Sequence, residues 1–415
     1  MHSASSWRCA ELVDAADVYK SGVLAGSLTR TPAGIAFDYA DSYPADAPQV
    51  ATTLPRTDAP LVTPAGAVPP FFAGLLPEGR RLTALRRAVK TSADDELSLL
   101  VAVGADTIGD VQVVAHGEQP PAESSGISID ARAGFRFDDL LAEAGVSERP
   151  ALAGVQDKAS AAMLSLPVRR RGERFILKLD PPDYPNLVDD EAFFLSLAHE
   201  THLPAVRASV LTDASDRHGL LVTRFDRVAD TSLAVDAVRS IAVEDAAQVA
   251  GVWPADKYNL SFEQAASALI GVTKAPAVAG LRLLEQLAFA WLTGNGDQHA
   301  KNLSVFEAVP GEFRVAPAYD LPATLFYGDE TLALTVGGRD TLTAARFVEA
   351  ANEIGVPPRA ATRALSSALN TLAALPDRIE AGALPFDRRV NVKAARTLRR
   401  RHRELGEGLA RLREA

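Results

Sequence analysis

The sequence predicts an α+β protein in which a β-rich first half precedes a mostly helical second half. Short strand-like runs broken by Gly, Pro and Asp fill residues 1–116, and two further apolar β-type runs follow at 159–168 and 174–179. From residue 240 onward the apolar residues recur mostly at helical spacing. A chain of 415 residues exceeds one compact core, so we expect two or three domains.

The first domain is expected to span residues 1–123. Its predicted strands and helices are strands at 18–19, 22–28, 34–39 and 109–114, with helices near 80–90 and 94–103. Residues 117–128 (GEQPPAESSGIS) have the composition of a linker, which places the boundary there.

The second domain is expected at 124–228 and the third at 229–415. In the second, a charged turn at 169–173 joins the two β-type runs into a hairpin, a helix at 192–200 follows the acidic residues 189–191, and 220–225 forms a strand. The third domain is expected to contain helices at 244–251, 261–271, 280–293, 343–354, 358–375 and 391–413.

Composition excludes several classes of protein. The formal net charge of −10 does not suit a non-specific nucleic-acid coat, which needs surplus Lys and Arg to neutralise phosphates. The single cysteine, Cys9, excludes an internal disulfide framework and a cysteine-built zinc site. No stretch approaches 18 apolar residues, so we expect a cytoplasmic protein that does not enter a membrane. Only eight of the 43 basic residues are Lys, so a retained Lys can mark a position that needs a compact ammonium.

The segment 294–305 carries the strongest chemical signal. Asp297 and Asn302 are separated by five positions, as are the Asp and Asn of the protein-kinase catalytic loop. There the Asp accepts the proton of the substrate hydroxyl and the Asn binds Mg²⁺. Asp320 follows a β-type run and supplies a second metal ligand. The alternative is structural: Asp297 and Asn302 as turn formers and Asp320 as a helix N-cap.

A kinase also needs a strand lysine for the phosphates and a helix glutamate that fixes this lysine. Lys178 lies in the β-type run FILKL and shares a strand face with Ile176, and Glu191 begins the next helix. The loop ALAGVQDK at 151–158, one strand earlier, is in the position of a phosphate-covering loop. Lys178 can alternatively be an edge-strand charge that limits aggregation.

Together these residues resemble the HipA family, the kinase toxins of bacterial HipBA toxin–antitoxin modules. The resemblance rests on AGVQDK at 153–158, FILK at 175–178, Asp190-Glu191 (with Asp190 where the family has Asn), RFDR at 224–227, EDAAQ at 244–248, Lys257-Tyr258, DQHAKN at 297–302, PAYD at 317–320 and FFAGLLPE at 71–78. It implies a kinase-like two-lobed fold with an extra β-rich N-terminal subdomain and an all-α C-terminal lobe.

The resemblance also implies roles for individual residues. Asp297 would be the catalytic base, and Asn302 and Asp320 would hold Mg²⁺. ATP would be bound by Ala153, Gly154, Val155, Gln156, Asp157, Lys158, Lys178, Glu191, Thr223, Arg224, Phe225, His299, Lys301 and Tyr319. His299 can equally be an ordinary hydrogen-bonded loop histidine. Thr223 stands where the family often has an acidic residue, and Ala151 stands where it has a Ser that is autophosphorylated, which puts self-inhibition by that route in question.

The function implied is a Mg²⁺- and ATP-dependent serine/threonine protein kinase that arrests growth by phosphorylating a host protein, with an aminoacyl-tRNA synthetase among the family's targets. Its partners would be a helix-turn-helix antitoxin of the HipB type and, mainly through that antitoxin, operator DNA. The basic C-terminal helix can touch operator phosphates or form a solvated face. Two other functions remain open: a catalytically silent corepressor, and a small-molecule kinase of the aminoglycoside-phosphotransferase type, which lacks the AGVQDK and RFDR elements.

Overall fold

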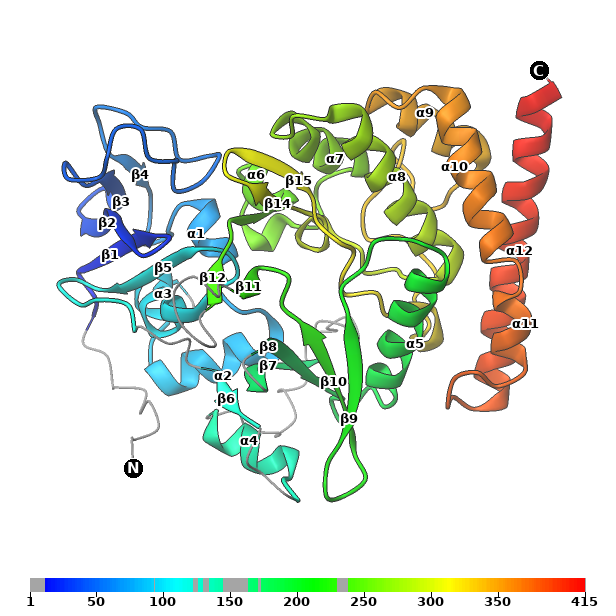
Figure 1. Ribbon diagram of the computed structural model, residues 1–415, viewed down its shortest axis with the longest axis horizontal. Helices are drawn as coiled ribbons and strands as arrows, with labels where there is room; N and C mark the ends of the chain where they lie inside the picture. Colours follow the sequence, from blue (N-terminus) through cyan, green and yellow to red (C-terminus); the bar gives the residue numbers. More distant parts are fainter. Residues whose placement is uncertain are drawn as a thin grey trace.

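The computed structural model describes residues 12–92, 94–121, 126–129, 134–144, 163–170, 173–229 and 238–414. These residues form three parts (Figure 1): an N-terminal sheet with helices, a second sheet, and a helical part that also holds a small sheet. The order from β-rich to helical is the one that the sequence predicts. The C-terminal part is not all-α as expected, because Val243–Asp245, Ser304–Val309 and Glu312–Val315 pair as a small antiparallel sheet.

The N-terminal part is an antiparallel five-stranded sheet in the order β4-β3-β2-β1-β5. Ser21 and Gly22 join β1 to β2 with positive φ angles of 49° and 81°, as a two-residue type I′ hairpin turn requires. Alternate strand residues such as Val18 and Phe37 pack against Phe72 in one core. The elements are β1 (Ala15–Lys20), β2 (Val23–Thr31), β3 (Gly34–Tyr39), β4 (Leu61–Thr63), β5 (Val111–Ala115), α1 (Pro70–Gly74), α2 (Gly79–Val89), α3 (Glu96–Val103) and the 3-10 helix η1 (Gly104–Asp106).

The second sheet has the order β6-β7-β8-β10-β9 and contains the predicted hairpin. Along β8, Phe175, Leu177 and Leu179 are buried in the core of this sheet, whereas Ile176 and Lys178 face the opposite side. The elements are β6 (Ile127–Ser128), α4 (Phe137–Glu143), β7 (Leu164–Arg170), β8 (Glu173–Leu179), α5 (Leu187–Glu200), β9 (Ala208–Thr212) and β10 (His218–Thr223).

The third part packs helices around the long, apolar α8, and none of the helices in the described ranges is long and apolar enough to cross a membrane. Two short sheets, β11-β12 and β13-β14-β15, lie at its border with the other parts. The strands are β11 (Arg227–Ala229), β12 (Val238–Ser240), β13 (Val243–Asp245), β14 (Ser304–Val309) and β15 (Glu312–Val315). The helices are α6 (Ala246–Val249), α7 (Phe262–Gly271), α8 (Pro276–Thr293), α9 (Ala344–Glu353), α10 (Pro358–Thr371), α11 (Leu375–Glu380) and α12 (Arg388–Glu414), with 3-10 helices η3 (Pro254–Asp256), η4 (Ala300–Asn302) and η5 (Thr324–Tyr327).

Several predicted helices have other bounds in the structure: α5 begins at Leu187 rather than 192, which places Glu191 inside the helix rather than at its start, and α8 begins at Pro276 rather than 280. The helix predicted at 358–375 is two helices, α10 and α11, because Pro376 is tolerated in the first turn of α11 but not in the interior of a continuous helix. The helix predicted at 244–251 is shorter, since residues 243–245 pair with β14 as a strand. Asp245 then caps α6, its carboxylate accepting the backbone N–H of Gln248 at 2.8 Å.

Buried ion pairs attach the N-terminal part to the segment after β10. Arg224 donates to Asp226 at 2.7 Å and to Asp106 of η1 at 2.9 Å, and Arg227 donates to Asp226 at 2.6 Å. Burial tends to raise the pKa of Asp226, but the two guanidinium groups hold it below its usual value. Asp226 also accepts the backbone N–H of Gly109 at 2.9 Å, so one carboxylate joins two parts of the chain.

The N-terminal part also binds the helical part. Gln248 of α6 donates its side-chain amide to the carbonyl of Phe71 in α1 at 2.9 Å, and Trp253 donates its indole N–H to the carbonyl of Val68 at 3.1 Å. A Cβ on Gly74 would lie 2.7 Å from Cγ of Gln248, so the close approach of α1 to α6 requires glycine there. The N-terminal part is therefore held by both of the other parts.

Replacing Asp226 with Asn is expected to lower the free energy of unfolding by about 3 kcal/mol, because two buried guanidinium groups then share one carboxylate, that of Asp106, in place of two. Urea denaturation of the full chain measures the change. The matched control is Asp41→Asn, which removes a carboxylate from an exposed position. Equal stability of the two variants would contradict the anchoring role of Asp226.

Candidate active site

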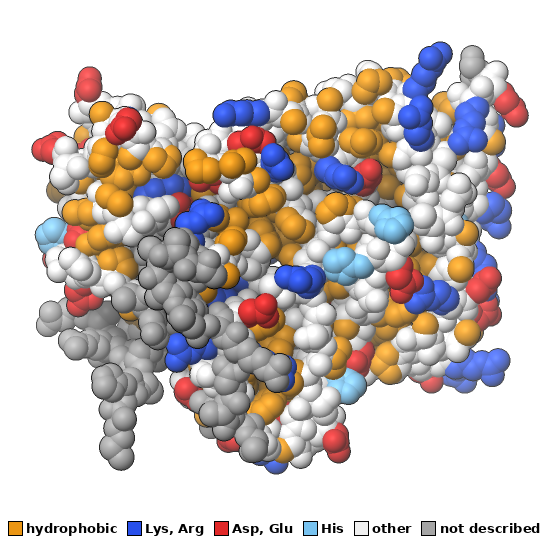
Figure 2. All heavy atoms as spheres, viewed as in Figure 1, with side chains coloured by type: hydrophobic (Ala, Val, Ile, Leu, Met, Phe, Trp, Pro, Cys, Tyr) orange, Lys and Arg blue, Asp and Glu red, His pale blue; other side chains and the backbone are white. Residues whose placement is uncertain are grey.

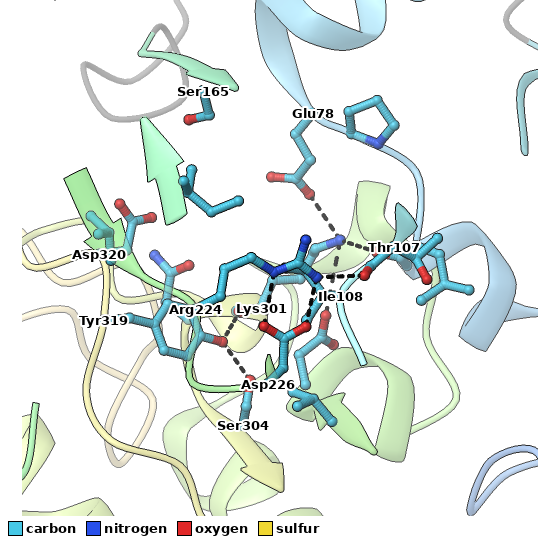
Figure 3. A pocket seen from close by; sticks show the side chains of 18 of the residues that line it. Glu78, Thr107, Ile108, Ser165, Arg224, Asp226, Lys301, Ser304, Tyr319 and Asp320 are labelled. Atoms are coloured by element: carbon cyan, nitrogen blue, oxygen red, sulfur yellow. Dashed lines mark hydrogen bonds and ion pairs between the residues drawn. The ribbon is translucent and has the colours of Figure 1, made fainter. Parts of the chain in front are cut away.

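A cleft of about 370 Å³ lies where the three parts meet (Figure 3). Its volume lies in the range of small-molecule and cofactor pockets, roughly 300–1,000 Å³. The sequence-predicted residues that line it are Lys178, Thr223, Arg224, Phe225, Asp297, His299, Lys301, Asn302, Tyr319 and Asp320. Glu191 lies directly behind Lys178, so residues from 178 to 320 converge on one place.

The loop after α8 presents Asp297 and Asn302 to the cleft. Gly294 ends the helix in the left-handed conformation, with φ of 85°. The side chain of Asn295 accepts the backbone N–H of Asp297 at 2.9 Å, and the amide nitrogen of Asn302 donates to the carbonyl of Asp297 at 2.8 Å. These two hydrogen bonds close the loop and hold Asp297 and Asn302 in a fixed position relative to each other. Because Asn302 uses its nitrogen here, its side-chain oxygen remains the end suited to a metal.

The Asp297 carboxylate is held from a second element. Tyr258 donates its hydroxyl proton to Oδ1 of Asp297 at 3.0 Å, and Asp297 is only 2% exposed. Burial and the nearby carboxylate of Asp297 raise the pKa of Tyr258, so this phenol stays a hydrogen-bond donor at neutral pH. The orientation of Asp297 is thus set before any substrate arrives.

Lys178 forms the centre of a largely buried ion cluster. Its Nζ donates to both oxygens of Glu191, at 2.7 and 2.8 Å, and to Oδ1 of Asp320 at 2.7 Å. Burial raises the pKa of Glu191, and Lys178 acts in the opposite direction. Burial would also raise the pKa of Asp320, but Lys178 holds it below its usual value. The predicted pairing of Lys178 with Glu191 is confirmed.

A second charge cluster crosses the cleft from the N-terminal part (Figure 3). Oε2 of Glu78 lies 2.5 Å from Nζ of Lys257, and Oε1 of Glu78 lies 3.4 Å from Nζ of Lys301. Burial opposes the charge of Glu78, but Lys301 and Lys257 lower its pKa to about 2. Lys301 also donates to the carbonyl of Gly74 at 2.8 Å. A carboxylate of the N-terminal part is therefore bound by two lysines of the helical part.

His299 differs from an ordinary hydrogen-bonded loop histidine. It is 3% exposed, and burial and Lys257 lower its pKa to about 3, so it is neutral at physiological pH. Its Nδ1 is buried and has no hydrogen-bond partner among the described residues. The ring packs edge-on against Tyr258, with centroids 5.1 Å apart. The alternative interpretation of His299 as a satisfied histidine is not supported.

Two aromatic side chains also line the cleft. Phe225 stacks on Tyr319 with ring centroids 5.9 Å apart, beside Thr223 at the end of β10. The hydroxyl of Tyr319 donates to the carbonyl of Lys301 at 2.7 Å and shares a hydrogen bond with Ser304, so this ring is fixed in place. The guanidinium of Arg224 is used by Asp106 and Asp226, and its backbone N–H donates to the carbonyl of Arg174 at 3.0 Å.

The predicted phosphate loop, with Ala153, Gly154, Val155, Gln156, Asp157 and Lys158, lies outside the described residues, as does Ala151.

The sequence prediction assigns no role to Glu78 and Lys257, which line the cleft, or to Tyr258, which binds Asp297. All three lie in segments that carry the family resemblance, but no spacing rule connects Glu78 with lysines 179 and 223 positions away. For Lys257 the sequence does offer one signal of a special role, because lysine is rare in this chain and Lys257 is one of only eight.

Side-chain chemistry in the cleft fits a Mg²⁺–nucleotide. The described residues contain no group of three or more His, Cys, Asp or Glu side chains arranged to hold a metal ion by themselves. Asn302 and Asp320 offer two oxygen ligands, which suits Mg²⁺ because this ion usually takes few protein ligands and completes its shell with water and phosphate oxygens.

Comparison with family models gives two matches. Residues 150–375 match the HipA-like C-terminal domain, and residues 16–114 match the HipA N-terminal domain. Two curated relatives come from Sinorhizobium fredii. "Putative kinase Y4mE" is 29% identical over 351 residues, covering 79% of this chain and 81% of the relative, and "Putative kinase Y4dM" is 31% identical over 291 residues, covering 64% and 65%.

Among solved structures, the chain resembles one from the complex of Shewanella oneidensis MR-1 HipA, HipB and operator DNA. The TM-score is 0.77 at 19% sequence identity, and the match covers 96% of this chain and 99% of that one. The two proteins therefore share a fold. The predicted α+β, kinase-like fold with its extra N-terminal subdomain is confirmed.

Replacing Asp190 with Asn is expected to stabilise the protein at neutral pH. Asp190 is fully buried beside Glu191, its Oδ2 accepts the N–H of Ala323 at 2.7 Å, and burial raises its pKa well above the usual value. A carboxyl with a raised native pKa contributes most below its unfolded pKa, about 4, and this contribution is lost as pH rises through the native pKa. Asparagine keeps the acceptor without the charge.

Urea denaturation at a series of pH values tests this expectation. The free energy of unfolding of Asp190→Asn, minus that of the wild type, should increase between about pH 4 and pH 7 by roughly 1 kcal/mol or more. The exposed Asp46→Asn serves as control and should show no such trend. A difference that does not vary with pH would show that Asp190 is not the titrating group.

Proposed function

The chain belongs to the HipA family, and from this membership and the geometry of the cleft we propose that it is a Mg²⁺- and ATP-dependent serine/threonine protein kinase, the toxin of a type II toxin–antitoxin module. The observation that carries the proposal is the convergence of Asp297, Asn302, Asp320 and Lys178 on one cleft. These are the four side chains that phosphoryl transfer of the kinase type requires.

Each of these residues has a task that its surroundings support. Bound Mg²⁺–ATP supplies the γ-phosphoryl group and the positive charge of the metal. Asn302 and Asp320 are the residues that would hold the metal, through their side-chain oxygens. Lys178, kept in position by Glu191, offers its ammonium to phosphate oxygens. Asp297, oriented by Tyr258, accepts the proton of the substrate hydroxyl.

The aromatic part of the cleft lining suits a nucleobase. Phe225 and Tyr319 offer apolar ring surface for an adenine, beside Thr223. Thr223 replaces an acidic residue often found in the family, so these contacts would differ in detail from those of its relatives. His299 and Lys301 also line the cleft, where Lys301 lies 3.4 Å from Glu78.

The proposed partners are a helix-turn-helix antitoxin of the HipB type, operator DNA, and a host protein phosphorylated on Ser or Thr, for which an aminoacyl-tRNA synthetase is a candidate. The solved complex that contains HipA, HipB and operator DNA supports the first two. Phosphorylation of such a synthetase would arrest translation and growth.

The ion pairs along the basic helix α12 support the proposal that the antitoxin, rather than this chain, makes most of the DNA contacts. Figure 2 shows basic and acidic side chains mixed along the edge that α12 forms. Arg399 pairs with Asp377 and Glu380, and Lys393 pairs with Glu330 at 3.5 Å. Arg401 points inward, over the ring of Trp291. Acidic neighbours that already neutralise these cations weaken any attraction to phosphate.

Asp297→Asn is expected to lower the rate of substrate phosphorylation by about 10²–10⁴-fold, because the variant cannot accept the hydroxyl proton. The measurement is incorporation of label from [γ-³²P]ATP into proteins of a cell lysate, together with growth after induced expression. The control, Asp340→Asn, changes an exposed carboxylate of the same part and should label proteins and arrest growth like the wild type.

A silent corepressor gives a different result in the same experiment. The wild type and the Asp297→Asn variant would then arrest growth equally, and no labelled band would depend on the Asp297 carboxylate. That outcome would overturn the kinase proposal.

A further inference from the structure

Glu78 is a residue of the N-terminal part whose carboxylate lies inside the cleft. Its two oxygens are divided between two cations, Oε2 with Lys257 at 2.5 Å and Oε1 with Lys301 at 3.4 Å. Both lysine side chains are largely withdrawn from solvent, with exposed fractions of 10% and 12%, whereas Glu78 is 34% exposed. An oxyanion bound by two ammonium groups is also how proteins bind phosphate.

The carboxylate of Glu78 does not serve its own helix. Glu78 is the N-cap residue of α2, and its side chain makes no capping hydrogen bond. The segment from Gly74 to Glu78 is carried to the cleft by the docking of α1 on α6, through Gln248 and the absence of a Cβ at Gly74. The position of Glu78 in the cleft therefore comes from tertiary structure rather than from local helix capping.

The lysines depend on Glu78 to different degrees. Lys301 has a second acceptor, the carbonyl of Gly74 at 2.8 Å, and Asp245 lies 3.9 Å away. For Lys257, Glu78 is the carboxylate within ion-pair distance among the described residues, and the ring of Tyr258 lies 5.2 Å from its ammonium. Without Glu78, Lys257 would face the cleft with its charge uncompensated. The neighbouring Nδ1 of His299 is already without a partner among the residues that the structure describes.

We propose that Glu78 is a built-in competitor for nucleotide phosphate: it neutralises Lys257 and Lys301 in the free protein and must release them when a phosphate group of ATP binds. This inference rests on the proposed ATP-dependent function and adds a specificity-determining residue from the N-terminal part. Because release costs free energy that only a phosphate-bearing ligand recovers, Glu78 weakens binding of ATP without weakening binding of adenosine.

Equilibrium binding to the full-length chain tests the proposal, with Mg²⁺–ATP and adenosine as separate ligands in isothermal titration calorimetry. Glu78→Gln should bind ATP about tenfold more tightly than the wild type and adenosine equally well, a change typical of coupling between competing groups at one site. Glu118→Gln removes an exposed carboxylate from the same part and should match the wild type for both ligands.

Two further variants make the binding test independent of any change in the folding stability of Glu78→Gln. Glu78→Asp keeps the charge but withdraws it from the lysines by one methylene, and should give a smaller gain in ATP affinity. In a Lys257→Gln background, Glu78→Gln should give less of a gain than in the wild type, because one of the released cations is absent.

The outcomes separate this inference from the proposed function. ATP binding by the wild type, with equal or weaker binding by Glu78→Gln, would overturn the competitor role alone and identify Glu78 as a support for the lysines. A wild-type chain that binds no Mg²⁺–ATP would overturn both proposals. A gain for adenosine equal to the gain for ATP would also reject competition with phosphate.

Discussion

The ammonium group of Lys178 is the constraint on which the arrangement of the second sheet and the helical part depends. It comes from β8, its partner Glu191 from α5, and its partner Asp320 from the loop after β15. A largely buried cation is tolerated only with its anions in place, and loss of one partner from such a pair costs about 3–5 kcal/mol. The sheet, the helix beside it and the loop that carries Asp320 are therefore fixed together, and the cleft between them has a defined shape.

The N-terminal part acts as a third wall of this cleft. It is bound to the segment after β10 by Asp106 and Gly109, and to α6 and η3 by the carbonyls of Phe71 and Val68. If the N-terminal part were bound to the second sheet alone, or to the helical part alone, the remaining part could move relative to it. Contacts with both bring Glu78 within reach of lysines in the helical part. Opening of the cleft must consequently strain or break some of these bonds.

The site features that can be predicted from the sequence are those formed by residues that lie close together in the chain. Asp297 and Asn302 lie in one loop, and Lys178 and Glu191 lie on a strand and the next helix, so spacing and alternation bring them together. Glu78 meets Lys257 only through the docking of two parts, which no local pattern encodes. The same limit applies to the fold: the break between α10 and α11 is marked by Pro376, whereas β13 forms because β14, about 60 residues later, pairs with it.

The choice between lysine and arginine follows from geometry. Of the lysines in the described residues, Lys20, Lys178, Lys257 and Lys301 are largely withdrawn from solvent, and Lys90, Lys274 and Lys393 are exposed. Lys178 binds acceptors on two different elements, and so does Lys301. Lys20 likewise binds the carbonyl of Val50 and the carboxylate of Asp110.

A compact ammonium has three donors that point in different directions, whereas the planar guanidinium offers its donors as a fork. The chain uses arginine where a fork fits, as in Arg224, which donates from two nitrogens to the two oxygens of Asp226. It keeps lysine where acceptors from separate elements meet at one point. Lys20, Lys178 and Lys301 therefore mark junctions between elements, and two of them, Lys178 and Lys301, line the cleft.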